Sequence, residues 1–85
     1  MPWTQLAITW ERQAVRDLRG LPARDIEQIR DAVKLLAETG RGDVVAPHGQ
    51  AGHRLRVRGR RVFLTIARAE GLLIVTRVIT RGDAY

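Results

Sequence analysis

Five arginines lie within eight residues of the stretch HRLRVRGRRVF, which spans His53 to Phe63. Polar and apolar residues alternate in its first half, which predicts a β-strand that buries Leu55 and Val57 and exposes the arginines between them. A guanidinium group stays protonated at neutral pH and binds a phosphate through two parallel N–H donors. This stretch therefore indicates binding of a phosphate-rich ligand or another polyanion.

The positive charge of the chain is confined to its second half. Residues 1–40 carry six basic and six acidic side chains, whereas residues 41–85 carry nine arginines and three acidic side chains, so the second half accounts for the net charge of +6. A one-sided basic surface indicates a nucleic acid or an acidic protein as partner. The alternative is a solvated basic face that binds nothing.

The hydrophobic pattern predicts a two-layer α+β domain. Apolar residues at helical spacing predict helices over 10–19 and 23–38, with Gly20 as a left-handed cap of the first and Thr39-Gly40 closing the second. Between the second helix and the basic stretch lies a glycine-rich loop with a brief extended piece at Val44-Val45. Strands are predicted over 4–9, 53–58, 61–67 and 72–79, the last as a central strand covered on both faces. The order is β-α-α-β-β-β: an N-terminal strand, an antiparallel helical hairpin, then a three-stranded antiparallel meander.

A turn at Gly59 connects the second and third predicted strands. It places Arg61 beside Arg54 and Arg56, on the face of the sheet opposite the helices. The tail TRGDAY, which directly follows the last strand, adds two residues near enough to reach this face (Arg81, Tyr85).

The composition argues against several other classes of protein. The chain has no cysteine, no apolar run long enough to span a membrane, no P-loop and no serine nucleophile motif. We expect a single domain over residues 1–85, located in the cytoplasm, with no metal, no cofactor and no membrane partner.

Together, the order of elements and these residues resemble the RelE/ParE superfamily of toxins from bacterial type II toxin–antitoxin systems. The resemblance covers nearly the whole chain and rests on LRGLP between the two helices, the glycine-rich loop, the HRLRVRGRRVF hairpin and the ending RVITRGDAY. The RelE branch resembles this chain more closely than the ParE branch does. RelE-like toxins are ribosome-dependent endoribonucleases that cleave mRNA in the decoding site, whereas ParE-like toxins inhibit DNA gyrase.

The resemblance implies functional roles for five residues, which stand at the positions of the family's basic residues and C-terminal tyrosine (Arg54, Arg56, Arg61, Arg81, Tyr85). Cleavage by attack of the RNA 2′-OH passes through a phosphorane, which Arg61 and Arg81 are expected to stabilise. Tyr85 is expected to act as a base or to stack on a nucleobase, and the arginines around it would lower its pKa from about 10. Which residue is the general base stays open, because arginine stands where the best-known members have lysine. The remaining candidates are expected to bind RNA, with the histidine as a further candidate general acid (Arg54, Arg56, Arg58, Arg60, His53).

The resemblance also implies partners. They are the ribosome with its mRNA, and a cognate antitoxin protein that covers the basic face in a toxin–antitoxin hetero-oligomer. Expression alone is then expected to inhibit translation and arrest growth. We expect poor cleavage of naked RNA, because the small sheet offers no deep groove to orient a strand. The alternatives are a ParE-like gyrase inhibitor, a non-catalytic nucleic-acid-binding module and an inactive relative.

Overall fold

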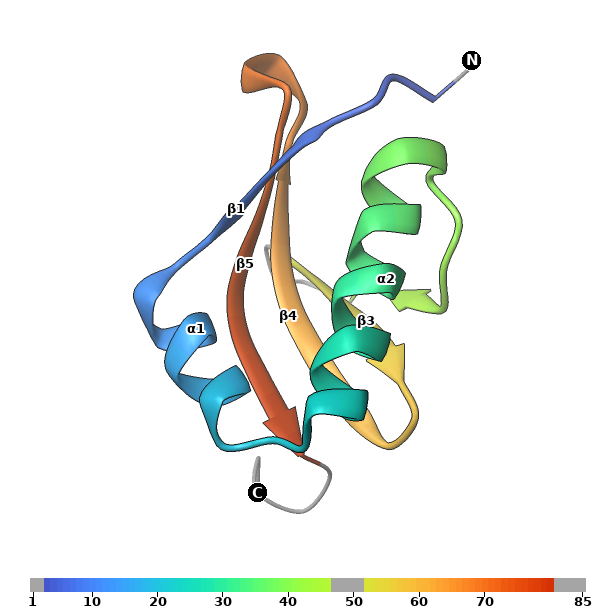
Figure 1. Cartoon of the computed structure of the whole chain (residues 1–85). Coiled ribbons are helices and arrows are strands. Elements are labelled where there is room, and N and C mark those ends of the chain that lie inside the picture. Colours follow the sequence, from blue (N-terminus) through green and yellow to red (C-terminus); the bar gives the residue numbers. More distant parts are fainter. Residues whose placement is uncertain (1–2, 47–51, 81–85) are drawn as a thin grey trace.

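The computed structural model describes residues 3–46 and 52–80. Helices and strands follow the predicted order, and the extended piece predicted at Val44-Val45 is a short strand (Figure 1). A 3-10 helix before the last strand was not predicted. The α+β prediction is confirmed, and most boundaries shift by one to three residues. The elements are β1 (Ala7–Trp10), α1 (Arg12–Arg19), α2 (Ala23–Thr39), β2 (Val44–Val45), β3 (His53–Val57), β4 (Arg60–Ala67), the 3-10 helix η1 (Arg68–Glu70) and β5 (Leu72–Thr80).

One five-stranded sheet contains all of these strands, in the order β1-β5-β4-β3-β2. The predicted meander is confirmed: β3, β4 and β5 pair antiparallel in sequence order. The N-terminal strand joins it by pairing parallel with β5, from Ala7 beside Leu72 to Trp10 beside Val75. The extended piece Val44–Val45 pairs with β3 and forms the opposite edge of the sheet.

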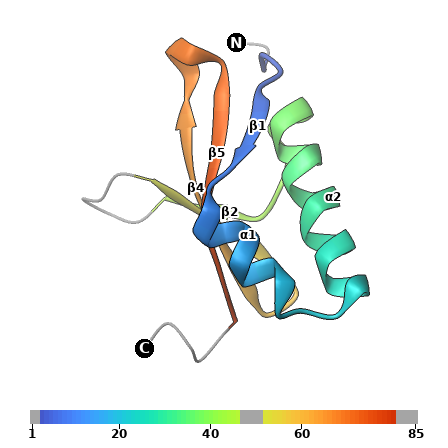
Figure 2. The same ribbon diagram turned by 60° about the vertical axis from the view of Figure 1, so that its left-hand side comes forward.

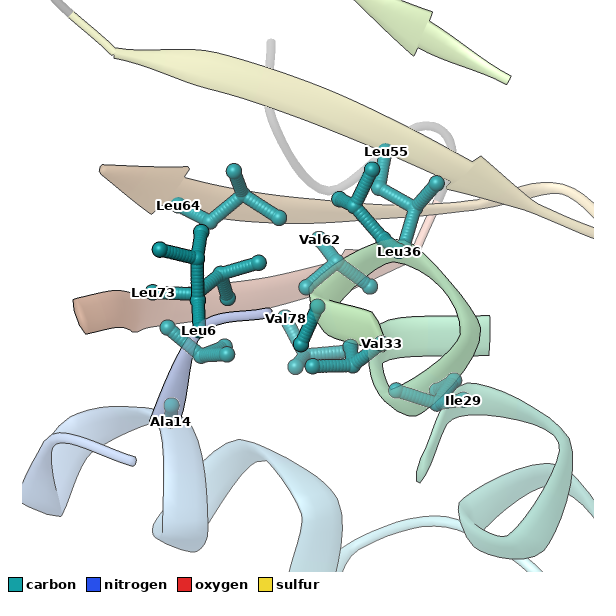
Figure 3. Close-up of a cluster of buried hydrophobic side chains, with 12 residues drawn as sticks. Leu6, Ala14, Ile29, Val33, Leu36, Leu55, Val62, Leu64, Leu73 and Val78 are labelled. Atoms are coloured by element: carbon teal, nitrogen blue, oxygen red, sulfur yellow. The ribbon is translucent and has the colours of Figure 1, made fainter. Parts of the chain in front are cut away.

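The hydrophobic core lies between the helices and one face of the sheet (Figures 2 and 3). On α2, Ile29, Val33 and Leu36 follow the i, i+4, i+7 spacing that puts side chains on one helical face, and each is at most 2% exposed. They meet apolar side chains of three strands and of α1 in one cluster that includes Leu55, Val62, Leu64, Leu73 and Ala14.

Two details of the prediction are wrong. β5 is not covered on both faces: Leu73 and Val75 are buried, but Ile74 between them is only half-buried, because both helices lie on the core side. Gly20 does not adopt a left-handed conformation, since its φ is −84°. The left-handed cap belongs to α2, where Gly40 has a φ of 78°. None of the described helices is long and apolar enough to cross a membrane.

Candidate nucleic-acid interface

The β3–β4 hairpin positions the basic residues through a two-residue turn. Val57 pairs with Arg60, and the turn residues Arg58 and Gly59 have φ values of 47° and 79°. Two consecutive positive φ angles are typical of a type I′ turn, whose twist matches that of the flanking strands. This turn fixes the register of the hairpin, and therefore the face that each arginine occupies.

Three arginines share the outer face of the sheet, as the sequence predicted. Arg56 lies directly opposite Arg61 across the hairpin, and Arg54 lies one step further along β3 on the same face. Their neighbours in the chain, Leu55 and Val62, are buried on the helix side. We call Arg54, Arg56 and Arg61 the arginine face.

An open hollow of 360 Å³ lies on this side of the hairpin, lined by Val45, Arg54, Arg56, Gly59, Arg60 and Arg61. None of these described lining residues is acidic. Arg56 and Arg61 lie directly across the strand pair, and a guanidinium fork suits the oxygens of a phosphate. The hollow therefore favours a phosphate-bearing ligand.

The other predicted RNA-binding residues lie apart from the arginine face. Arg58 is exposed in the hairpin turn. The guanidinium of Arg60 pairs with the carboxylate of Asp25 on α2 at 3.2 Å, so it reaches toward the helix layer although the residue borders the hollow. His53 lies opposite the buried Leu64, on the core side of β3. His53 is two residues before Leu55 and four before Val57, so the alternation of the strand already placed it on the core side.

The tail residues Arg81 and Tyr85 lie outside the described residues, so their predicted roles stay predictions. β5 ends one residue earlier, at Thr80, which lies opposite Arg60. The last described residue of β5 thus lies beside the turn of the β3–β4 hairpin.

One further arginine of the sheet is engaged elsewhere. Arg77 on β5 donates from Nε to Oδ2 of Asp17 on α1 at 2.9 Å, and the backbone N–H of Val78 donates to the same oxygen at 2.9 Å. Burial acts to raise the pKa of Asp17, but hydrogen bonds from Arg77, Val78 and Gln13 outweigh it, so the pKa lies below its ordinary value. Asp17 in turn raises the pKa of Arg77. This ion pair fastens α1 to the sheet.

Phe63 is a residue of the outer face that the sequence analysis did not single out. It lies two residues after Arg61 on β4, and therefore on the same face of the sheet, and it pairs with Arg54 on β3. The same alternation that located the arginines would have located it. Among the described residues, no group of three or more histidine, cysteine or acidic side chains is placed to hold a metal ion.

Solved structures of RelE toxins share this architecture. The archaeal RelE–RelB complex from Pyrococcus horikoshii matches with a TM-score of 0.79 at 17% identity, over 93% of this chain and 98% of that one. The chain has the fold of RelE toxins. A mutant of the E. coli toxin RelE in the free state matches with a TM-score of 0.78 at 15% identity, over 95% of this chain and 87% of that one.

The toxin–antitoxin complex RelBE2 from Mycobacterium tuberculosis matches with a TM-score of 0.72 at 21% identity, over 95% of this chain and 100% of that one. No protein-family model and no curated protein matches the sequence. At these identities the likeness concerns the fold, and the activity has to be argued from the residues of this chain.

Proposed function

We propose that this protein is the toxin of a type II toxin–antitoxin system and that it acts as a ribosome-dependent mRNA endoribonuclease. The observation that carries the proposal is the arginine face, an outer sheet surface with three arginines on a fold shared with RelE toxins. Neither part suffices alone, because one fold hosts several functions and a basic face is common on nucleic-acid-binding proteins.

The arginine face suits the charge that develops during RNA cleavage. Attack of the 2′-OH, which loses its proton, on the adjacent phosphate forms a phosphorane with more negative charge on its oxygens than the ground state. The bond to the 5′-oxygen then breaks, this oxygen takes up a proton, and a 2′,3′-cyclic phosphate remains. Arg61 and Arg56, directly opposite each other, can donate to two of these oxygens from neighbouring strands. Arg54, two residues from Arg56 along β3, would lie beside the neighbouring nucleotide. Arg81 and Tyr85 complete the proposed catalytic set, with Tyr85 as base or stacking group.

The shape of the face explains why the ribosome would be needed. The hollow is open, and the strand that borders it, β2, has only two residues. Such a surface binds phosphates but does not hold an RNA strand in line for attack, and orientation of the reacting groups contributes several kcal/mol to catalysis. A message held in the decoding site would arrive already oriented.

A cognate antitoxin follows from the same charge distribution. An acidic or amphipathic antitoxin segment would fold onto a protein of net charge +6 and cover the arginine face. The matching structures from Pyrococcus horikoshii and Methanococcus jannaschii are both RelE–RelB complexes, the latter with a TM-score of 0.75 at 18% identity, over 91% of this chain and 94% of that one. They support a complex of this kind for the present chain.

The test is expression of the chain alone in bacteria, with growth recorded and the 5′ ends of translated messages mapped. Arg61→Ala tests the arginine face. Arg30→Ala is the matched control, because it removes the same charge from an exposed position on α2.

Growth arrest with new 5′ ends inside reading frames, lost in Arg61→Ala and kept in Arg30→Ala, would support the proposal. Arrest with DNA damage but without new ends would replace it with gyrase inhibition. If the wild-type chain neither arrests growth nor creates new ends, the proposal is wrong.

A further inference from the structure

The single phenylalanine of the chain lies on the outer face, beside the arginine face. Phe63 is half-buried, in the same alternation as Arg61 and two residues away from it along β4. Two residues of a strand span about 6.6 Å. An aromatic ring thus lies within the length of one nucleotide of the proposed phosphate-binding arginines.

An irregularity of the neighbouring strand lies directly beside Phe63. The register between β4 and β5 shifts between Phe63 and Leu64, which leaves Thr76 of β5 as an extra residue. The hydroxyl of Thr76 donates to the carbonyl oxygen of Phe63 at 3.1 Å. Bulges of this kind bend a strand and redirect its side chains, and they recur beside functional sites.

The ring is paired with one arginine of the face. The guanidinium carbon of Arg54 lies 5.4 Å from the centroid of the Phe63 ring, within the range of a cation–π contact. The Nε of Arg54 is buried and donates no hydrogen bond to the described part of the protein. The contact with the ring is therefore the described interaction that orients this guanidinium.

We propose that Phe63 and Arg54 form a stacking platform for one nucleobase of single-stranded RNA, next to the phosphates bound by Arg56 and Arg61. This inference rests on the proposed function and deepens it by assigning a base-binding residue. Proteins bind unpaired bases by stacking them on aromatic rings or on guanidinium planes exposed on a sheet. The platform tolerates every base, and it favours purines because they offer the larger stacking surface.

The experiment measures binding of the purified chain to two fluorescein-labelled RNA probes at low salt, by fluorescence anisotropy. One is an oligoadenosine of about eight nucleotides, within the site sizes of sheet-based single-strand binders. The other has the same length and phosphates but abasic nucleotides at its centre. Phe63→Leu removes the aromatic ring, Phe63→Tyr keeps it, and Arg56→Ala removes a phosphate-binding group.

We expect Phe63→Leu to weaken binding of oligoadenosine about tenfold, the effect of losing one stacked base, and to leave binding of the abasic probe unchanged. Phe63→Tyr should bind both probes as the wild type does. Arg56→Ala should weaken both probes alike, because its contact does not involve a base.

Two results would overturn the platform: equal weakening of both probes by Phe63→Leu, which marks a structural role, or no weakening of either. Thermal unfolding of each variant by circular dichroism shows whether the leucine variant is folded. If it is not, the wild type alone tests the platform, because it must then bind oligoadenosine more tightly than the abasic probe. The outcome is independent of the proposed nuclease activity. The chain can show no mapped cleavage in cells and still bind oligoadenosine less tightly with Phe63→Leu. Equally, it can cleave messages in cells although Phe63→Leu affects both probes alike.

Discussion

Replacing Asp17 with alanine removes the carboxylate that holds the second half of β5 to α1. The parallel pairing of β1 with β5 ends at Trp10 and Val75, and the last backbone bond between them runs from Glu11 N–H to the carbonyl of Val75. Beyond that point no β1 carbonyl accepts a hydrogen bond from β5 in the described structure. Oδ2 of Asp17 instead accepts the N–H of Val78 at 2.9 Å. Val78 is 6% exposed, so its N–H has little access to water.

The magnitude follows from that buried N–H group. Leaving a buried backbone donor without an acceptor costs about 2 kcal/mol. In a domain of this size, each kcal/mol changes the melting temperature by roughly 4–8 °C, so Asp17→Ala should lower it by about 10 °C. Asp17→Asn should lower it less, because the amide oxygen can still accept the N–H of Val78 while the charge that attracts Arg77 is lost.

The effect should depend on pH with a defined sign. Burial acts to raise the pKa of Asp17, but the hydrogen bonds that its carboxylate accepts lower the pKa by more than burial raises it. The pKa in the folded state therefore lies below the unfolded value. A carboxylate of this kind stabilises the fold fully above its unfolded pKa, about 3.9, and the contribution disappears as the pH falls through the lower folded pKa.

Thermal unfolding followed by circular dichroism at pH 7, 5 and 3 measures both quantities. The difference between wild type and Asp17→Ala should be the same at pH 7 and 5, and smaller at pH 3. Equal melting temperatures at pH 7 would refute the account of this bond. A difference that stays constant down to pH 2 would refute the role of the charge.

Three further predictions concern single residues. Gly40→Ala should lower the free energy of unfolding by about 2 kcal/mol in a urea titration, because φ is 78° and a Cβ there would lie 2.6 Å from the ring of Trp3. Arg58→Asn should raise the melting temperature by a few degrees, because asparagine suits the positive φ of 47° before Gly59. It should also lower RNA cleavage in cells, because a charge expected to bind RNA is lost. Arg61→Ala should reduce the cleavage rate about 100-fold, and Arg60→Ala distinctly less, because the guanidinium of Arg60 pairs with the helix layer; equal losses would contradict the assignment of faces.

Alternation along the strands made the arginine face predictable from the sequence. Leu55 and Val62 are apolar and have to be buried, and the period of two then assigns Arg54, Arg56 and Arg61 to the opposite face. The same rule, applied throughout, gives His53 to the core side and Phe63 to the outer face.

Other features depend on contacts between distant parts of the chain, which periodicity does not encode. The parallel pairing of Ala7–Trp10 with β5 joins segments more than 60 residues apart. The bulge at Thr76 interrupts an apolar run that carries no glycine or proline as a signal. Asp17, read from the sequence, is one acidic residue of a polar helix face, and its bond to Val78 emerges only once α1 packs on β5.

We propose that the chain cleaves mRNA on the ribosome. The most direct measurement is primer extension on a defined message after incubation with the purified chain, with purified ribosomes stalled on that message and without ribosomes. We expect cuts at the codon in the decoding site when ribosomes are present, few cuts in naked RNA, and loss of the cuts with Arg61→Ala but not with Arg30→Ala. An intact message on the ribosome, or equal cutting with and without ribosomes, would contradict the proposal.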